Sequence, residues 1–324
     1  MFIRRKLYLI ITLMYMFISC MAGHGNDTAK FRIVGYYSLA TAMRADLKTV
    51  PFDKLTHINL YFLNPDTTGN FQQDFSSLVP FITEAHRHHV SVLPSIAGGG
   101  PHTYYHDLLK DEKRPALINN LMQIVAKYNF DGIDVDIEGK DIDENYEPFA
   151  LELGEALHND HKIITAAIAI FYKDVLSDKA LSQYDFVNVM SYDHTGPWRP
   201  EKPGPHATYE QSVADIDYFA TDRKIPKENM NLGLPFYGYG FGPALTSPAS
   251  SLNYGQITTQ FPNAHLSDSL VMTDGATLYY NGTGTVIKKV LLAKEKAGGV
   301  MIWQLSGDAA DDKSLLSAIN TAIH

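Results

Sequence analysis

Eight short runs of β-forming apolar residues divide the chain from residue 31 onward, and longer helix-like stretches separate them. These runs cover residues 31–37, 55–63, 90–96, 130–137, 162–170, 186–192, 231–241 and 298–305. Helical patterns such as 116–128 and 285–297 lie between them, so the order strand then helix repeats along the chain. Eight such units predict an α/β fold of the (β/α)8 barrel type, with active residues at the carboxyl ends of the strands.

One long stretch, residues 242–284, interrupts this order. It is rich in Ser, Thr, Pro, Gly and Asn and contains no clear strand–helix unit. We interpret it as an excursion between the seventh and eighth strands. Since the sequence has no internal repeat and no linker that would separate a second domain, we expect one barrel domain over residues 31–324.

The first 19 residues have the layout of a signal peptide, because three basic residues precede an apolar run at residues 7–18. This run is shorter than the roughly 20 residues that cross a bilayer, so a transmembrane anchor is the weaker alternative. Cys20, the single cysteine, ends the run Phe-Ile-Ser-Cys, which resembles a bacterial lipobox. In a lipobox the cysteine becomes the lipid-modified first residue. The alternative is a chance cysteine at an ordinary cleavage site.

This N-terminal pattern predicts a lipoprotein signal peptide over residues 1–19 and a short tether over residues 20–30. We therefore expect an exported protein that is lipid-anchored at the cell envelope or surface. If the cysteine is incidental, the protein would be secreted instead. The anchor is the only membrane attachment that we expect.

The charge balance excludes some classes of partner. The formal net charge is −9, and it becomes −12 without residues 1–19, which carry three positive charges and no negative ones. An acidic surface argues against nucleic-acid binding, which needs clustered Lys and Arg, and it suits a neutral or cationic ligand. Because one cysteine cannot form an internal disulfide, the fold must depend on its hydrophobic core.

The most informative segment is Asp-Gly-Ile-Asp-Val-Asp-Ile-Glu at residues 131–138. In a strand, this alternation places Asp134, Asp136 and Glu138 on one face and the aliphatic side chains on the other. Carboxylates inside a barrel are costly to bury unless they share protons or hydrogen bonds. The pattern therefore indicates a functional site.

Three other interpretations of this segment fit less well. A solvated edge strand conflicts with the flanking pattern, which is that of a buried parallel strand. A calcium loop would place Asp134, Asp136 and Gly139 at positions one, three and six, but Asn145 then stands where the bidentate glutamate belongs. A magnesium site for phosphoryl transfer lacks an accompanying phosphate-binding glycine–lysine loop.

Closely spaced carboxylates suit the cleavage of glycosidic bonds. The leaving oxygen must be protonated near neutral pH while positive charge develops at the sugar carbon, so one carboxyl must stay protonated and a neighbour charged. Repulsion between Asp134 and Asp136 would raise the apparent pKa values of the carboxyl groups on this strand. A proton could then be shared along the strand as far as Glu138.

The segment 131–138 resembles the signature of glycoside hydrolase family 18, the chitinase family, at every fixed position, and four further segments follow in the family's order. The resemblance spans nearly all of residues 31–324 and implies the substrate-assisted mechanism of that family. It implies that Glu138 protonates the scissile oxygen, that Asp136 orients the 2-acetamido group and that Asp134 shares a proton with Asp136. Asp131 would be a supporting residue on the substrate side.

The resemblance also implies roles at the sixth and eighth strands. In Met-Ser-Tyr-Asp, residues 190–193, Tyr192 would donate a hydrogen bond to the acetamido oxygen, Met190 would line the pocket and Asp193 would contact the same sugar. In the closing run, Trp303 would form a stacking floor for the sugar, with Gln304 nearby.

Three more positions follow the family's pattern. Tyr36 and Ser95 match first- and third-strand residues that touch the middle aspartates, and Trp198 resembles a platform on the leaving side. Trp303, Met190 and Tyr36 could instead be ordinary core residues, and Trp198 could be a surface-loop aromatic. Their joint placement at strand ends favours the functional interpretation.

The sequence also departs from the family's pattern. The third-strand Ser-x-Gly-Gly appears as Ser-Ile-Ala-Gly at residues 95–98, and the arginine that often follows Tyr237 and Gly238 is replaced by Tyr239. These changes affect positions that would contact the sugar on the leaving-group side of the scissile bond. They do not affect the catalytic acid, Glu138. Residues 242–284 are short for the insertion domain that deepens the cleft of processive chitinases, so we expect a barrel without a full insertion domain and a shallow groove.

These observations predict a retaining, substrate-assisted glycoside hydrolase that cleaves β-1,4 linkages of N-acetylglucosamine polymers, chitin or its oligosaccharides. The first alternative is an endo-β-N-acetylglucosaminidase acting on the chitobiose core of N-glycans. The second is a non-catalytic chitin-binding barrel, which the presence of Glu138 with all three aspartates argues against. We expect a monomer with no cofactor, no metal and no nucleic-acid partner.

Overall fold

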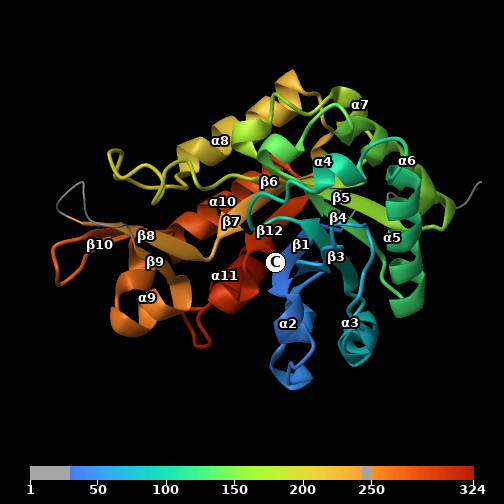
Figure 1. Ribbon diagram of the computed structural model, residues 1–324. Coiled ribbons are helices and arrows are strands. Elements are labelled where there is room, and N and C mark those ends of the chain that lie inside the picture. Colours follow the sequence, from blue (N-terminus) through green and yellow to red (C-terminus); the bar gives the residue numbers. More distant parts are fainter. Residues whose placement is uncertain (1–29, 243–249) are drawn as a thin grey trace, which may run out of the picture. The chain divides into compact units, whose positions relative to one another are not determined.

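Eight parallel strands close into a barrel in the computed structural model, which describes residues 30–242 and 250–324 (Figure 1). Neighbouring strands pair in chain order, and the last pairs back with the first. The barrel strands are β1 (Arg32–Ser38), β2 (His57–Tyr61), β3 (Ser91–Ala97), β4 (Gly132–Asp136), β5 (Ile163–Ala169), β6 (Phe186–Met190), β7 (Met230–Pro235) and β12 (Gly299–Trp303). The predicted (β/α)8 barrel is confirmed, and each strand falls within or beside one of the eight predicted runs.

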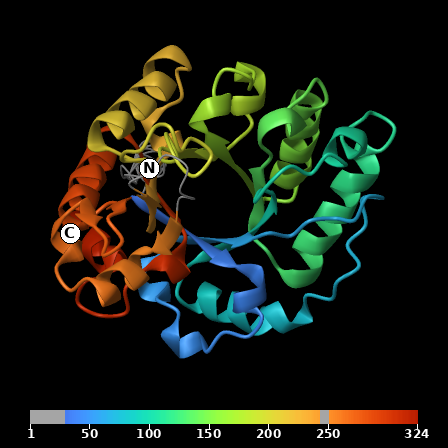
Figure 2. The ribbon, with the colours of Figure 1, turned by 60° about the vertical axis from the view of Figure 1, so that its left-hand side comes forward.

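Helices surround the strands on the outside of the barrel (Figure 2). They are α2 (Leu39–Ala42), α3 (Val79–Arg87), α4 (Tyr105–Leu108), α5 (Arg114–Tyr128), α6 (Tyr146–Asn159), α7 (Asp178–Leu181), α8 (Tyr209–Asp217), α10 (Thr283–Lys296) and α11 (Leu315–Ile323). The two helices predicted at 116–128 and 285–297 correspond to α5 and α10. Helix α5 begins with a proline in its first turn and ends at Asn129, which adopts the left-handed conformation of a helix C-cap.

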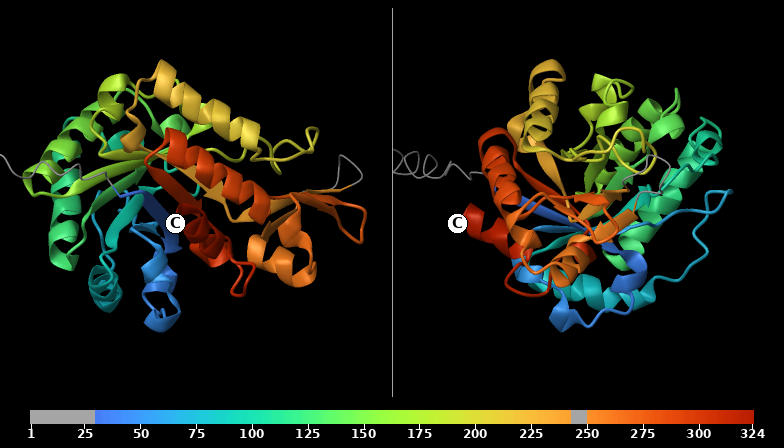
Figure 3. Two further views of the ribbon diagram at one scale, coloured as in Figure 1. Left: turned by 180° about the vertical axis from the view of Figure 1, so that it is seen from behind. Right: turned by 90° about the vertical axis from the view of Figure 1, so that its left-hand side faces the viewer.

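The predicted seventh strand, residues 231–241, is in fact two strands. Strand β7 ends at Pro235, and β8 (Tyr237–Phe241) leaves the barrel to pair with β9 (Ser250–Asn253) and β11 (Thr277–Tyr279). With β10 (Ser269–Val271) they form a four-stranded antiparallel sheet beside the barrel (Figure 3), accompanied by α9 (Tyr254–Gln260).

The interpretation of residues 242–284 as a stretch without clear units was therefore wrong in part. Strands of three or four residues that include Ser, Thr and Asn give too short an apolar pattern to be recognised in the sequence. Their pairing partner is β8, which lies inside the run that we read as one barrel strand.

The hydrophobic core lies between the strands and the outer helices. On β4, Ile133 and Val135 are buried in this layer, while Asp134 and Asp136 are 0% and 3% exposed on the other face. The predicted alternation of β4 is thus confirmed. Gly132 permits the close approach of β5, because a Cβ at this position would lie 1.9 Å from the carbonyl oxygen of Ile163.

Residues 1–29 lie outside the described part of the chain, and with them the predicted signal peptide, almost all of the tether and Cys20. A compact unit extends from Phe31 to His324. In the described ranges, no helix has both the length and the apolar character needed to cross a membrane.

Candidate active site

The innermost carboxylate of the acidic strand, Asp134, is surrounded by hydrogen-bond donors from neighbouring strands. Tyr36 and Ser95 donate to its Oδ2 at 2.6 and 2.7 Å, and the Thr165 hydroxyl donates to Oδ1 at 2.5 Å. The amide nitrogen of Asn188 lies 3.5 Å from Oδ1. Burial raises the pKa of Asp134, and the donors act against that rise. Asp134 is therefore a fixed and fully hydrogen-bonded group.

The next carboxylate, Asp136, has the opposite character. Its Oδ1 has no hydrogen-bond partner within residues 30–242 and 250–324, although the side chain is buried. Burial, followed by the charges of Glu138 and Asp134, raises its pKa well above the usual range. A buried polar atom without a partner is costly, so this oxygen is poised to bind a polar group of a ligand.

Glu138 follows directly after β4 at the carboxyl end of the barrel. Burial raises the pKa of its carboxyl to about 7, and the negative charge of Asp193 contributes to the rise. A carboxyl with a pKa near 7 is half protonated at neutral pH and can serve as a general acid and then as a base.

A cavity of about 920 Å³ opens at the carboxyl ends of the strands, and Glu138 lines it. The structure brings five more of the predicted site residues to its wall, which are Met190, Tyr192, Asp193, Trp198 and Trp303. Glu138 and these five residues therefore share one cavity.

The aromatic floor of the cavity is held in place by other rings. Trp303 packs against Tyr36, Tyr61 and Phe62 with ring centroids 5.4, 4.9 and 5.9 Å away. Tyr192 is buried, and its hydroxyl is 3.8 Å from the sulfur of Met301, which is a weak acceptor. This hydroxyl can donate a stronger hydrogen bond to a ligand oxygen.

Four predicted substrate-binding residues lie elsewhere. Asp131 precedes β4 at the other end of the barrel, where it accepts hydrogen bonds from the Val92 backbone and from His86. At about 3.3 Å per strand residue it is far from Glu138, so its assignment to the substrate side was wrong. Tyr36 and Ser95 contact Asp134, as expected, but they do not line the cavity.

Gln304 is also not part of the cavity wall. Its side-chain oxygen accepts hydrogen bonds from Tyr61 and, at 2.7 Å, from the Ser306 hydroxyl. Gln304 therefore fixes the segment after Trp303 instead of lining the cavity.

Several residues of the site were not predicted from the sequence. Thr165 and Asn188 are buried polar residues in otherwise apolar strands, and that interruption is a signal that could have identified them. Phe171, Tyr172, Arg199 and Tyr237 line the cavity from loops and from β8, where no periodic pattern indicates the direction of a side chain.

The third-strand departure from the family's pattern has a local compensation. Ala97 has a left-handed φ of +63°, which is unfavourable for a residue with a Cβ. The side chain of Asn64 accepts a hydrogen bond from the Ala97 nitrogen at 2.6 Å and donates one to its oxygen at 3.0 Å. Gly98 must remain glycine, because a Cβ there would overlap the Phe62 ring and lie 2.5 Å from Asp136.

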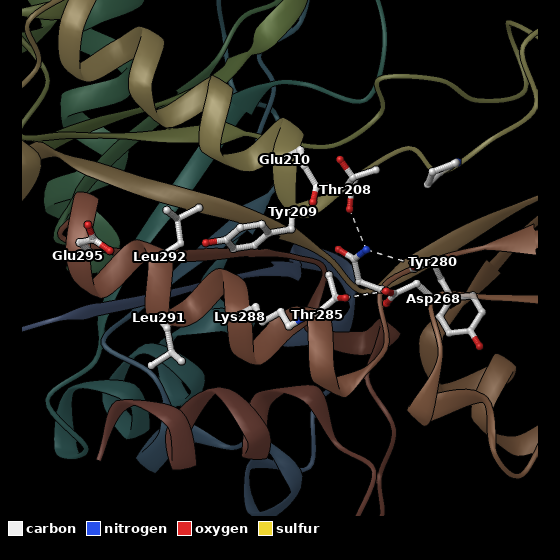
Figure 4. Close-up of a pocket in the computed structure, with 13 residues that line it drawn as sticks. Thr208, Tyr209, Glu210, Asp268, Tyr280, Thr285, Lys288, Leu291, Leu292 and Glu295 are labelled. Carbon is white, nitrogen blue, oxygen red and sulfur yellow. Dashed lines mark hydrogen bonds between the residues drawn. The ribbon is translucent and has the colours of Figure 1, made fainter.

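A second cavity of about 640 Å³ lies beside α10, between Thr208, Asp268 and Lys288 (Figure 4). Its polar groups bind one another, since Thr285 donates to Asp268 at 2.6 Å and Asn281 donates to Ala207 and Tyr280. In the described ranges, no three His, Cys, Asp or Glu side chains are grouped as metal ligands.

Comparisons with known proteins agree with this geometry. The family described as "Glycosyl hydrolases family 18" matches residues 32–308. The crystal structure of the GH18 chitinase ChiB from the chitin utilization locus of Flavobacterium johnsoniae is 33% identical, with a TM-score of 0.80 over 90% of this chain and 94% of that one.

Curated relatives include two proteins named "chitinase-like effector". The one from Moniliophthora roreri is 27% identical over 72% of this chain, and the one from Moniliophthora perniciosa is 33% identical over 36% of it. The chain spans less than two thirds of these relatives, 64% and 28% of their respective lengths.

The electrostatics of the site predict that Asp193→Asn lowers the pKa of Glu138 from about 7 toward its ordinary value of 4.5. The substitution removes a negative charge that opposes ionisation of Glu138, whereas the burial of Glu138 remains. Carbon-13 NMR titration of labelled glutamate carboxyls measures this pKa, with Glu138→Gln identifying the resonance. The exposed Asp111→Asn should leave it unchanged. An unchanged pKa in Asp193→Asn would assign the whole shift to burial.

Proposed function

The chain belongs to glycosyl hydrolases family 18, and from that premise we propose that it hydrolyses β-1,4 bonds of N-acetylglucosamine polymers with retention of configuration. The observation that carries this proposal is the pairing of a carboxyl of pKa about 7, Glu138, with the unpartnered Oδ1 of Asp136 two residues earlier. One group can protonate a leaving oxygen near neutral pH. The other can accept a hydrogen bond from an amide N–H of the substrate.

The first chemical step follows from these positions. Glu138 transfers its proton to the glycosidic oxygen, and the bond from this oxygen to the anomeric carbon breaks. Asp136 shares a strand face with Glu138, so it cannot reach the opposite face of the sugar as a nucleophile. The acetamido oxygen of the substrate attacks the anomeric carbon instead, and an oxazolinium ion forms.

The second step completes the reaction. The Tyr192 hydroxyl exchanges its weak contact with the Met301 sulfur for a hydrogen bond to the acetamido oxygen, and Asp136 holds the acetamido nitrogen, so the ring-closed intermediate is stabilised. Water then attacks the anomeric carbon from the side that the leaving group vacated, and the bond from this carbon to the acetamido oxygen breaks, which regenerates the acetamido group. The Glu138 carboxylate accepts a proton from this water, which restores the acid.

The aromatic residues of the cavity suit an extended sugar chain. Trp303 can stack under the sugar at the cleavage point, while Trp198 and Phe171 also line the cavity with side chains that are 54% and 52% exposed. Exposed aromatic faces bind the apolar faces of sugar rings. They support substrate contacts on the leaving side as well, as in a chitooligosaccharide.

One observation favours an alternative substrate. Gly99 and Gly100 line the cavity, and a Cβ at Gly100 would meet nothing within 4 Å. This open wall leaves room for a branched glycan, so cleavage of the chitobiose core of N-glycans is the second candidate. It uses the same acid and the same acetamido chemistry. A non-catalytic sugar-binding barrel would not need a carboxyl group with a pKa of about 7.

The deciding experiment compares sugars released from chitooligosaccharides and from an N-glycoprotein, with Glu138→Gln beside the native protein. We expect release from chitooligosaccharides and a loss of about 10³-fold or more in Glu138→Gln, because an amide cannot deliver the proton. Calorimetry should still detect oligosaccharide binding to this variant.

The exposed Glu112→Gln is the matched control and should retain full activity. Release from the glycoprotein alone would select the alternative substrate. Near-native turnover by Glu138→Gln would remove this residue from the role of acid, and hydrolysis of neither substrate would contradict the proposed function.

The mechanism predicts that the first sugar product is the β-anomer. Because the acetamido group is the nucleophile, a thiazoline mimic of the intermediate should inhibit competitively, and substrates without the acetamido group should be almost inert. Proton NMR during the first minutes of hydrolysis measures the anomer. An α-anomer that appears first would indicate direct attack by water and would contradict this mechanism.

We also propose that Cys20 carries a lipid that anchors the exported protein at the cell envelope. The support is the lipobox-like Phe-Ile-Ser-Cys at the end of a short apolar run. Cys20→Ser should move the protein from the membrane fraction to the soluble fraction while its activity is retained. Membrane association that persists in this variant would contradict the anchor.

A further inference from the structure

His206 is a buried histidine in the segment that leads from β6 to α8. Its side chain is 1% exposed, and it belongs neither to the acidic row of β4 nor to the wall of the cavity. A histidine is rarely buried so completely unless its ring nitrogens have partners. Its surroundings therefore indicate what it does.

The ring nitrogen Nδ1 of His206 faces Asp193. It lies 3.2 Å from the carboxylate oxygen Oδ1, and the backbone N–H of the same residue points at it from a longer distance of 3.4 Å. Among the residues that the structure describes, His206 is the one basic side chain within ion-pair distance of Asp193. At residue 239, where the family often has an arginine, this sequence has Tyr239.

The imidazole is fixed by what surrounds it. The rings of Tyr237 and Tyr239 lie with their centroids 5.0 and 4.9 Å from it. The backbone oxygen of His206 accepts a hydrogen bond from the His194 nitrogen at 3.0 Å. The ring therefore cannot turn away from Asp193 without losing its contacts with Tyr237 and Tyr239, and the backbone bond fixes the segment that carries it.

The residue after His206 is anchored as well. The oxygen of Ala207 accepts hydrogen bonds from the buried side chains of Asn281 at 2.8 Å and Lys289 at 2.9 Å. Asn281, which lines the second cavity, follows β11 of the small sheet, and Lys289 belongs to α10. The segment that carries His206 is thus attached to elements outside the active site.

The proton of the neutral ring can be assigned from the other nitrogen. Nε2 is buried and has no hydrogen-bond partner among the described residues. A buried N–H without an acceptor is rarer than a buried acceptor without a donor. Hydrogen on Nδ1 gives up only the longer contact with the Asp193 backbone nitrogen. Hydrogen on Nε2 would be buried without an acceptor and would also turn the lone pair of Nδ1 toward the Asp193 carboxylate oxygen 3.2 Å away. The tautomer with hydrogen on Nδ1 therefore fits the site, and that hydrogen points at the carboxylate of Asp193.

Asp193 needs such a contact. Its backbone φ is +63°, a left-handed conformation that is unfavourable in a residue with a Cβ. Tyr237 donates to its Oδ1 at 2.5 Å, and that is the same oxygen that His206 approaches. Two donors from different segments thus hold one carboxylate oxygen beside the acid.

We propose that His206 is a positioning residue that donates its Nδ1 hydrogen to Asp193 and so holds the Asp193 carboxylate next to Glu138. The proposal rests on the proposed hydrolase function for its effect on catalysis, although the hydrogen bond itself does not depend on that function. His206 acts from behind the cavity wall and does not touch the substrate.

The consequence for the reaction is electrostatic. The charge of Asp193 helps to keep the pKa of Glu138 near 7, so Glu138 is protonated when the substrate binds. The titratable groups that face His206 are Asp193 from the loop after β6 and Tyr237 and Tyr239 from β8. If Asp193 turned toward solvent, the pKa of Glu138 would fall.

Two substitutions separate positioning from packing. His206→Asn places an amide donor near the position of Nδ1, whereas His206→Leu fills the space without a donor. We expect kcat/KM to fall about tenfold in His206→Leu and to stay within about threefold of native in His206→Asn. The alkaline limb of the pH profile of kcat/KM should move to lower pH in His206→Leu and stay in place in His206→Asn.

The matched control is His158→Asn, since His158 also pairs with a carboxylate, that of Asp185 at 3.1 Å, but outside the site. It should change neither kcat/KM nor the pH profile. Thermal melting of every variant accompanies the assays. An alkaline limb that is the same in His206→Leu and the native protein, or equal losses in both His206 variants, would overturn the proposal.

A measurement without substrate tests the hydrogen bond alone. Two-bond proton–nitrogen NMR spectra of the native protein distinguish the tautomers, and we expect hydrogen on Nδ1 of His206. Hydrogen on Nε2, with Nδ1 accepting from the Asp193 backbone, would overturn the proposal even if the enzyme is active. If His206→Leu does not fold, this spectrum and His206→Asn decide the question. If the native protein hydrolyses nothing, the proposed function fails, while this spectrum still tests His206.

Discussion

The burial of a row of carboxylates inside a barrel is the constraint on which the rest of the site depends. Charged groups are stable in an apolar interior only when donors surround them or when they are protonated, and the chain uses both solutions. Side chains from β1, β3, β5 and β6 donate hydrogen bonds to Asp134. Four other strands must therefore hold their positions relative to β4 so that one carboxyl group keeps its hydrogen bonds. Burial raises the pKa of all three groups, but at Asp136 and Glu138 no hydrogen-bond donors act against the rise. The same burial thus gives one inert group and two reactive ones along a single strand.

Periodic patterns made the barrel and the acidic row predictable from the sequence. Strand periodicity also indicated that Asp131 does not face the substrate. Alternate residues of a strand share a face, so Asp131 lies on the same side as Ile133 and Val135, whose side chains pack outward. The division of residues 231–241 into β7 and β8 was not predictable in this way, since both halves are apolar and the break depends on partners that come later in the chain. The same limit applies to Phe171 and Tyr237, which reach the cavity from a loop and from the second sheet.

The contact between His206 and Asp193 belongs to the class of features that no periodicity reveals. It joins two loop residues, each in a segment whose path is set by elements elsewhere, including the side chains of Asn281 and Lys289. The departure at Tyr239 was visible in the sequence, but its meaning depends on the imidazole that packs against that ring. A substitution away from a family's pattern therefore becomes interpretable when the neighbours of the new side chain are known.

Closure of the barrel between β1 and β12 has a consequence for how the molecule forms. Arg32 pairs with Gly299, so the contact that completes the ring joins segments from nearly opposite ends of the described chain. Contacts of such long range form late in folding, and until then β1 and β7 both present unpaired edges that other chains could join. Because β12 also carries Trp303, an incomplete chain lacks the sugar-stacking floor together with the last strand. Assembly of the barrel and completion of the binding site are therefore a single event, and no partly synthesised chain can possess the site.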